Sequence, residues 1–152
     1  MTRKTPLVGI TIRTACDKDA GELAALATQL GYPSTAAQIR KRLTQITADE
    51  EQAVFVAALP GAELAGFAHA FTTIRLFCDP FVELGALVVY KEMRGMGIGT
   101  MLVRTAEHWG VERGLRQIRI RSNALRAGAK GFYLRLDYDL SKTQNVFFKQ
   151  LE

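Results

Sequence analysis

The amino-acid sequence predicts a mixed α/β fold, in which a strand-rich sheet is flanked by about four helices. Segments with alternating apolar and polar residues, typical of half-buried strands, recur along the chain. Between them stand segments whose apolar residues repeat every three or four positions, as on one face of a helix. With 152 residues, 48% of them hydrophobic, the chain is long enough to form one compact domain, 1–152, with its own core.

Periodicity predicts the elements of the first half of the chain. Residues 8–12 alternate in the manner of a strand. Two amphipathic helices should follow, one over residues 17–31 and one that begins at Thr35, where the spacing to Gln38 is that of a capping box. Two apolar runs then predict an antiparallel hairpin, and they span residues 53–59 and 64–77.

The second half of the chain predicts a strand–helix–strand unit. After Asp79-Pro80 interrupts the chain, a strand is expected from Leu84 to Tyr90, followed by an amphipathic helix that stops at Gly114. A strand over residues 117–121 would complete a right-handed βαβ unit. A fourth helix and two closing strands are expected over residues 125–136, 138–140 and 145–151.

Composition and charge argue against several classes of protein. Cys16 and Cys78 lie far apart and lack metal-ligand spacing, so neither a disulfide framework nor a metal site is expected, and a reducing cytosol is the default. No segment has the pattern of a signal peptide or a membrane span. The net charge of +5 is dispersed among 15 acidic residues, without a basic and aromatic motif. The sequence therefore predicts a cytoplasmic protein, and it ranks nucleic-acid binding last.

The segment from Glu83 to Arg104 carries the clearest functional signal. An apolar strand leads into Arg94-Gly95-Met96-Gly97-Ile98-Gly99, which opens a helix. Glycines let the backbone approach an anion closely, and a helix N-terminus offers N–H groups and the positive end of its dipole. The segment is not a Walker A motif, because no Gly-Lys-Ser or Gly-Lys-Thr follows, and Thr100 breaks the GxGxxG pattern. A phosphate-bearing ligand of another kind is predicted.

Two motifs together resemble a known family. Residues 94–99 read Arg-x-x-Gly-x-Gly and resemble the pyrophosphate-binding motif of the GNAT superfamily of acyl-CoA-dependent N-acetyltransferases. Residues 122–138 resemble its SNxxRxxAxxFYxxLGY pattern, and LGYP and the tail KTQNVFFKQL are similar to small bacterial-type members. The resemblance implies a mostly antiparallel sheet of about six to seven strands, with acetyl-CoA in an opening between the strands that end near Tyr90 and Arg121.

The resemblance also implies the contacts of acetyl-CoA. The strand before the glycines would pair its backbone with the pantetheine arm, the glycine turn would hold the pyrophosphate, and the second motif would contribute two residues. Core packing is compatible with the strand role, and helix capping with that of the asparagine. The residues are Leu87, Val88, Val89, Arg94, Gly95, Met96, Gly97, Ile98, Gly99, Thr100, Asn123 and Ala129.

The same resemblance suggests catalytic residues, each with an open alternative. Tyr133 stands at the family's tyrosine position and would protonate the leaving thiolate, or it would only pack its ring. Glu83 stands where several members carry a glutamate that accepts the ammonium proton, which needs a raised pKa; a solvated glutamate is the alternative. The Val89 N–H is expected to stabilise the oxyanion. His69 and His108 are given no catalytic role.

The implied reaction is acetyl transfer from acetyl-CoA to a primary amine of a small molecule or peptide, by direct attack in a ternary complex. A non-catalytic acyl-CoA-binding module is the alternative, and a homodimer is left open. Lys130 replaces the family's common histidine and Asp137 its usual glycine, so the loop after the fourth helix could adopt another conformation. Four acidic residues could attract a cationic acceptor: Asp79, Glu83, Asp137 and Asp139.

Overall fold

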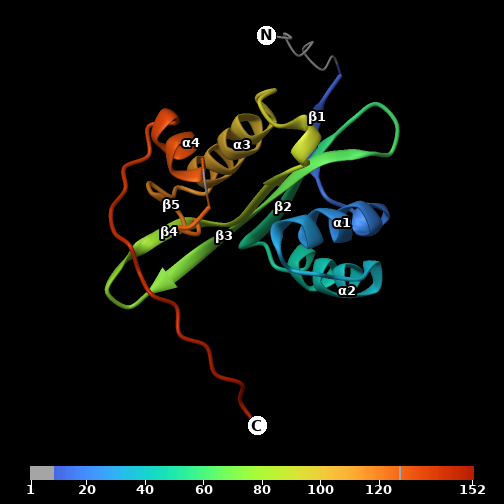
Figure 1. Ribbon diagram of the computed structural model, residues 1–152. Helices are drawn as coiled ribbons and strands as arrows, with labels where there is room; N and C mark the ends of the chain where they lie inside the picture. Colours follow the sequence, from blue (N-terminus) through green and yellow to red (C-terminus); the bar gives the residue numbers. More distant parts are fainter. Residues whose placement is uncertain (1–8, 127) are drawn as a thin grey trace. The chain divides into compact units, whose positions relative to one another are not determined.

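The computed structural model describes residues 9–126 and 128–152 (Figure 1). It divides into two compact units, Met1–Ile120 and Arg121–Glu152, and each is described by itself. The first unit contains a sheet and three α-helices among its described residues. Its elements are β1 (Thr11–Thr14), α1 (Ala20–Leu30), α2 (Ala36–Thr47), β2 (Gln52–Ala58), β3 (Leu64–Arg75), β4 (Cys78–Val89), α3 (Ile98–Glu112) and β5 (Ile118–Ile120).

The sheet follows the order of the chain, β1-β2-β3-β4-β5. The pairs β1/β2, β2/β3 and β3/β4 are antiparallel, whereas β4 and β5 are parallel and are connected through α3. This confirms the expected mixed fold with a mostly antiparallel sheet. The sheet of the described residues has five strands, slightly fewer than the six to seven expected.

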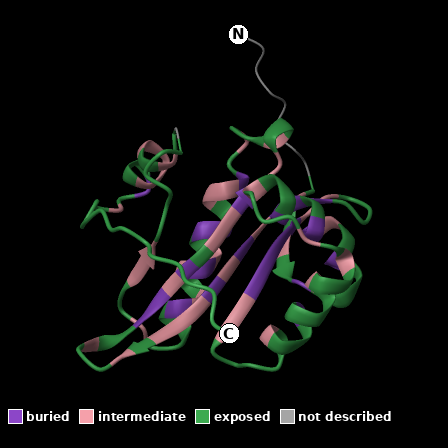
Figure 2. Ribbon diagram, turned by 60° about the horizontal axis from the view of Figure 1, so that its bottom comes forward, coloured by how far each residue is buried: buried purple, intermediate pink, exposed green. Residues whose placement is uncertain are grey.

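Helices cover both faces of this sheet. Figure 1 shows α3 against one face and α1 and α2 against the other. On the side of α1 and α2, Leu26 and Val56 are fully buried, and on α3 so are Leu102 and Val103 (Figure 2). The expected capping box opens α2, because Thr35 Oγ1 accepts from the Gln38 N–H (3.1 Å) and Gln38 Oε1 from the Thr35 N–H (3.0 Å).

Two glycines permit close packing around β4. A Cβ at Gly66 of β3 would overlap the carbonyl oxygen of Val88 and lie 3.1 Å from the Cα of Val89. A Cβ at Gly110 of α3 would overlap Cγ2 of Val82. At Val82 and at Val88–Val89, β4 is therefore packed against neighbours that leave no room for a side chain.

Some boundaries differ from the predictions for the first unit. Val8 lies outside the described residues, and β1 begins at Thr11, where the ladder with Ala58 starts. The chain is not interrupted at Asp79-Pro80, because β4 runs through it. Pro80 is accommodated where the β3–β4 register shifts, a position at which a missing N–H removes no ladder hydrogen bond.

The second unit contains α4 (Ala129–Arg135) and a C-terminal tail. The helix is shorter than the expected 125–136, since Leu125 precedes it in a turn and Ala127 lies outside the described residues. The expected strands over 138–140 and 145–151 are not formed. The tail is exposed throughout residues 139–152 (Figure 2). The side chains of Phe147 and Phe148 are about nine-tenths exposed, at 92% and 86%. A strand pattern forms a strand only when a neighbour pairs with it, and in this chain the tail has none among the described residues.

Candidate active site

The glycine turn connects β4 with α3. Its main chain passes through a short 3-10 turn, Lys91–Met93, and reaches Gly95 and Gly97 with φ of 77° and 84°, in the left-handed region that favours glycine. A Cβ at either position would meet no other atom of the described residues within 4 Å, so both glycines border open space. The turn can therefore be approached closely from outside.

The start of α3 supplies hydrogen-bond donors to the same place. The Met101 N–H donates to the carbonyl of Gly97 (3.0 Å), so the N–H groups of Ile98, Gly99 and Thr100 precede the first closed turn of the helix. These donors and the positive end of the helix dipole favour an anion. The turn therefore suits an anion, and its binding of a pyrophosphate stays a prediction.

The last part of β4 has one edge open. The Tyr90 N–H donates to the carbonyl of Ala65 (2.8 Å) on the β3 side. Because backbone groups alternate along a strand, those of Leu87 and Val89 point away from β3, and those of Val88 toward it. On the far side, β5 pairs with β4 only over Val82–Leu84. Beyond residue 84, no strand of the described part of the first unit pairs with this edge, as an opened sheet requires.

A side chain of α1 holds the end of this strand. Gln29 Nε2 donates to the carbonyl of Val89 (2.9 Å), and Gln29 Oε1 accepts from the Lys91 N–H (3.3 Å). One amide thus spans the point where β4 ends and the turn begins. The expected oxyanion donor, the Val89 N–H, belongs to a residue anchored in this way.

Glu83 lies in β4 with 14% of its side chain exposed. Its neighbour Val82 faces α3, where it packs against Gly110, so Glu83 faces the opposite side of the sheet, the side that carries α1 and α2. Arg75 Nη2 lies 3.9 Å from Glu83 Oε1, and Arg119 stands beside Glu83 in the β4–β5 register. The sequence did not reveal these two arginines, because only the strand register places them next to Glu83.

Each of the two histidines contacts a polar side chain. His69 Nε2 lies 2.9 Å from Gln52 Oε1, and burial lowers the pKa of the imidazole, so His69 is neutral at pH 7. His108 is exposed on α3, 3.1 Å from Glu112.

Among the described residues, no group of three or more His, Cys, Asp or Glu side chains could hold a metal ion. None of the helices described is both long and apolar enough to cross a membrane.

Tyr133 lies in α4 of the second unit and is half-buried. Its ring contacts those of Phe132 and Tyr138, with centroids 5.0 and 5.9 Å away. Burial raises the pKa of the phenol above its ordinary 10, and the positive charge of Arg126 offsets this in part. The hydroxyl therefore keeps its proton at neutral pH and is available as a donor.

The other expected residues of the second unit lie beside turns. Asn123 Oδ1 accepts from the Leu125 N–H (2.9 Å) and so closes a local turn. The helix-capping alternative is not formed, because Gly128 is the N-cap residue of α4. Ala129 is the first residue of α4. Asp137 has φ of 68°, so it adopts the left-handed conformation expected of the glycine that it replaces.

Comparison with known proteins identifies the family of this chain. Residues 20–138 match the family model described as the acetyltransferase (GNAT) family. The chain belongs to the GNAT acetyltransferase family. No curated protein sequence matches the chain.

Solved structures of similar fold cover nearly the whole GNAT chain. A transcriptional regulator from Bacillus halodurans C-125 is 23% identical, with a TM-score of 0.83 over 92% of this chain and 99% of its own. AAC(6')-Iy in complex with the bisubstrate analog CoA-S-monomethyl-acetylneamine is 20% identical (TM-score 0.80; 93% and 99%). The aminoglycoside 6'-N-acetyltransferase AAC(6')-Ih from Acinetobacter baumannii is 16% identical (TM-score 0.82; 95% and 100%). At these identities the likeness shows the fold alone.

Proposed function

We propose that this GNAT protein transfers the acetyl group of acetyl-CoA to a primary amine of a small molecule or peptide, by direct attack in a ternary complex. The observation that carries the proposal is the open glycine turn at the N-terminus of α3, directly after a strand with an unpaired edge. The similar fold of AAC(6')-Iy, solved with a bisubstrate analog of CoA, supports both a CoA thioester and an amine as substrates.

The residues of the first unit would bind the acetyl donor. The N–H groups from Arg94 to Thr100 hold the pyrophosphate, and the outward backbone groups of Leu87 pair with the pantetheine arm as an added strand would. The outward carbonyl of Val89 already accepts from Gln29, which leaves its N–H for the ligand. Acetyl-CoA supplies an activated acyl thioester. Asn123 and Ala129 are assigned to the same ligand by the second motif.

Three groups would carry the proton and charge changes. Glu83 accepts the proton of the ammonium group, so that a neutral amine attacks the acyl carbon. The Val89 N–H stabilises the oxyanion. As the new C–N bond forms and the C–S bond breaks, Tyr133 donates its proton to the departing thiolate. The raised pKa of its phenol keeps that proton in place until the transfer.

A thiol-release assay with acetyl-CoA and a panel of amines tests this function. We expect Tyr133→Phe to lower kcat about 100-fold or more, because a positioned general acid contributes at least that factor. Tyr138→Phe is the matched control, since it removes a phenolic hydroxyl but keeps the neighbouring ring. Unchanged turnover in Tyr133→Phe would remove Tyr133 as the acid.

The alternative is a module that binds acyl-CoA without turnover. It predicts that acetyl-CoA binds in a calorimetric titration while no amine releases thiol above the rate of hydrolysis. Under the proposed function the two experiments agree: binding is accompanied by amine-dependent thiol release. Binding without release from any amine would favour the alternative.

A further inference from the structure

We propose that the acceptor carries an anionic group close to its amine, and that Arg75 and Arg119 bind this group. The proposal rests on the proposed function and names the chemical class of the acceptor: a small amine with a carboxylate, such as an amino acid, or with a phosphate. It adds an anionic group to the cationic amine that the acidic residues are expected to attract.

Arg75 and Arg119 come from the strands on either side of β4, and both guanidinium groups lie over the ring of Phe81, two residues before Glu83 on the same face. Arg75, at the end of β3, has its Nη2 3.9 Å from Glu83 Oε1. Arg119 of β5 is the register partner of Glu83, and neighbouring strands are about 4.8 Å apart. An ammonium group at Glu83 therefore has two cations within the reach of an α-amino acid.

Both guanidinium groups contact the ring of Phe81. Its ring is fully buried, and the Cζ atoms of Arg75 and Arg119 lie 5.6 and 3.9 Å from its centroid. Contact with an aromatic ring orients a guanidinium and leaves its N–H groups free for bidentate hydrogen bonds. Both side chains are thus held in place before an anion arrives, which reduces the entropy lost on binding.

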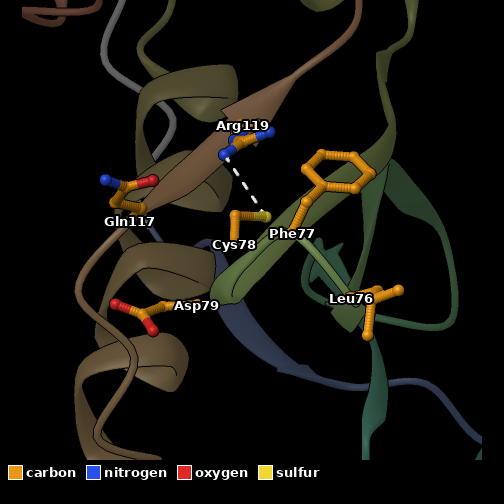
Figure 3. Close-up of a pocket in the computed structure, with 6 residues that line it drawn as sticks. All are labelled: Leu76, Phe77, Cys78, Asp79, Gln117 and Arg119. Carbon is orange, nitrogen blue, oxygen red and sulfur yellow. Dashed lines mark hydrogen bonds between the residues drawn. The ribbon is translucent and has the colours of Figure 1, made fainter.

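Arg119 carries a positive charge that no carboxylate of the described residues neutralises. It is half-buried, and in the described part of the chain no carboxylate lies within ion-pair distance of it. Its recorded polar contact is with Cys78 Sγ at 3.9 Å, a weak acceptor (Figure 3). A charge held away from water without a partner is unfavourable, and a carboxylate or phosphate of the acceptor would supply that partner.

A second polar group on this face also lacks a partner. The hydroxyl of Thr73, the register partner of Phe81, is buried and has no hydrogen-bond partner among the described residues. A buried hydroxyl without a hydrogen bond is unfavourable, and an anionic oxygen would accept one from it. The Arg119 guanidinium and the Thr73 hydroxyl can therefore both donate to an anionic oxygen on this face.

Space for the rest of the acceptor lies next to Arg119. A hollow of about 560 Å³ opens there, lined by side chains of the β3–β4 hairpin and of the segment that enters β5 (Figure 3). The lining residues are Leu76, Phe77, Cys78, Asp79, Gln117 and Arg119. Phe77 and Leu76 are exposed and offer apolar contact, and Asp79 adds one negative charge. With Asp79 and Glu83 against Arg75 and Arg119, the charges suit a zwitterion better than a polycation.

Matched pairs of acceptors test the proposal in the thiol-release assay. The pairs are L-phenylalanine with 2-phenylethylamine, L-arginine with agmatine, and phosphoethanolamine with ethanolamine. We expect the anionic member of at least one pair to have a kcat/KM at least 10-fold higher than its partner. A preference in the first two pairs indicates a carboxylate, and a preference in the third indicates a phosphate. Arg119→Gln should remove this preference through KM, Arg119→Lys should keep part of it, and Arg104→Gln on the surface of α3 should leave it unchanged.

The proposal is overturned if the amines without an anionic group react as well as their partners. It is equally overturned if Arg119→Gln lowers kcat/KM by the same factor for both members of a pair while its melting temperature is unchanged. Should acetyl-CoA bind without any amine being acetylated, the proposed function fails on its own. Calorimetric titration of the same pairs into CoA-loaded protein then tests the arginines, and equal binding of both members refutes their role.

Discussion

Replacing Gly97 by alanine separates the backbone's need for glycine from the ligand's need for open space. Gly97 and Gly114, before and after α3, have φ of 84° and 76°, and a Cβ at either would meet no atom within 4 Å among the described residues. Their substitution therefore costs only the left-handed strain, about 1–2 kcal/mol for an L-residue. In a chain of this length each kcal/mol lowers the melting temperature by about 2–4 °C, so both alanine variants should lose a similar few degrees.

The two variants should differ toward acetyl-CoA. At Gly97 the added methyl group points into the space assigned to the pyrophosphate, whereas Gly114 follows the other end of the helix, about 20 Å away for 15 residues at 1.5 Å each. We expect Gly97→Ala to raise the Kd at least 10-fold, which is about 1.4 kcal/mol, and Gly114→Ala to leave it unchanged. Gly95→Ala should behave like Gly97→Ala.

Titration calorimetry with acetyl-CoA measures the binding, and thermal unfolding followed by circular dichroism in the same buffer measures the strain. If Gly97→Ala and Gly114→Ala both bound acetyl-CoA as tightly as the unchanged protein, the glycine turn would not be the phosphate site. Equal weakening in both variants would instead trace the loss to stability, and the reasoning from open space at Gly97 would be refuted.

Three further predictions concern stability and assembly. Asp137→Gly should raise the free energy of unfolding by about 1 kcal/mol in a urea titration, since it relieves a left-handed aspartate; no gain would show that Asp137 is unstrained. Burial lowers the pKa of His69, so below about pH 6.5 the unfolded chain binds a proton that the folded chain does not. The free energy of unfolding should therefore decrease as the pH is lowered below about 6.5, and His69→Gln should make this decrease smaller. If the chain forms the homodimer left open by its sequence, sedimentation should give twice its 16.8 kDa, and Phe147→Ser with Phe148→Ser should halve that mass; a dimer unaffected by both would exclude the exposed tail as its contact.

The parts of the fold that the sequence predicts well are those with local causes. The capping box at Thr35 needs only a side chain and an N–H three residues away, and the turn at Gly97 needs only glycine where φ is positive. The tail shows the opposite case. Val146 and Phe147 stand in a strand-like pattern, but a ladder requires a second strand, and the pattern does not say where that strand is.

The candidate site divides in the same way. The glycine turn is contiguous and is visible in the sequence as a motif, whereas Arg75, Glu83 and Arg119 come from three strands. Their proximity depends on the register, which shifts twice between β3 and β4, at His69/Ala70 and again just before Arg75. Alternation along a single strand contains no information about such shifts, since each one changes which residues are neighbours.

The close approach of β3 to β4 at Gly66 bears on how this enzyme family member could be redesigned. Gly66 borders neither the glycine turn nor the arginines, yet any side chain there would push against the backbone of Val88 and Val89, the residues that lead to the turn. Variation aimed at a new acceptor has freedom at the exposed Leu76 and Phe77, where side chains meet mainly solvent. At Gly66 it has none, because a side chain there would move the main chain of Val88 and Val89. Under the proposed function, a library that includes this position would lose acetyl-CoA binding, and the loss would be mistaken for a change in specificity.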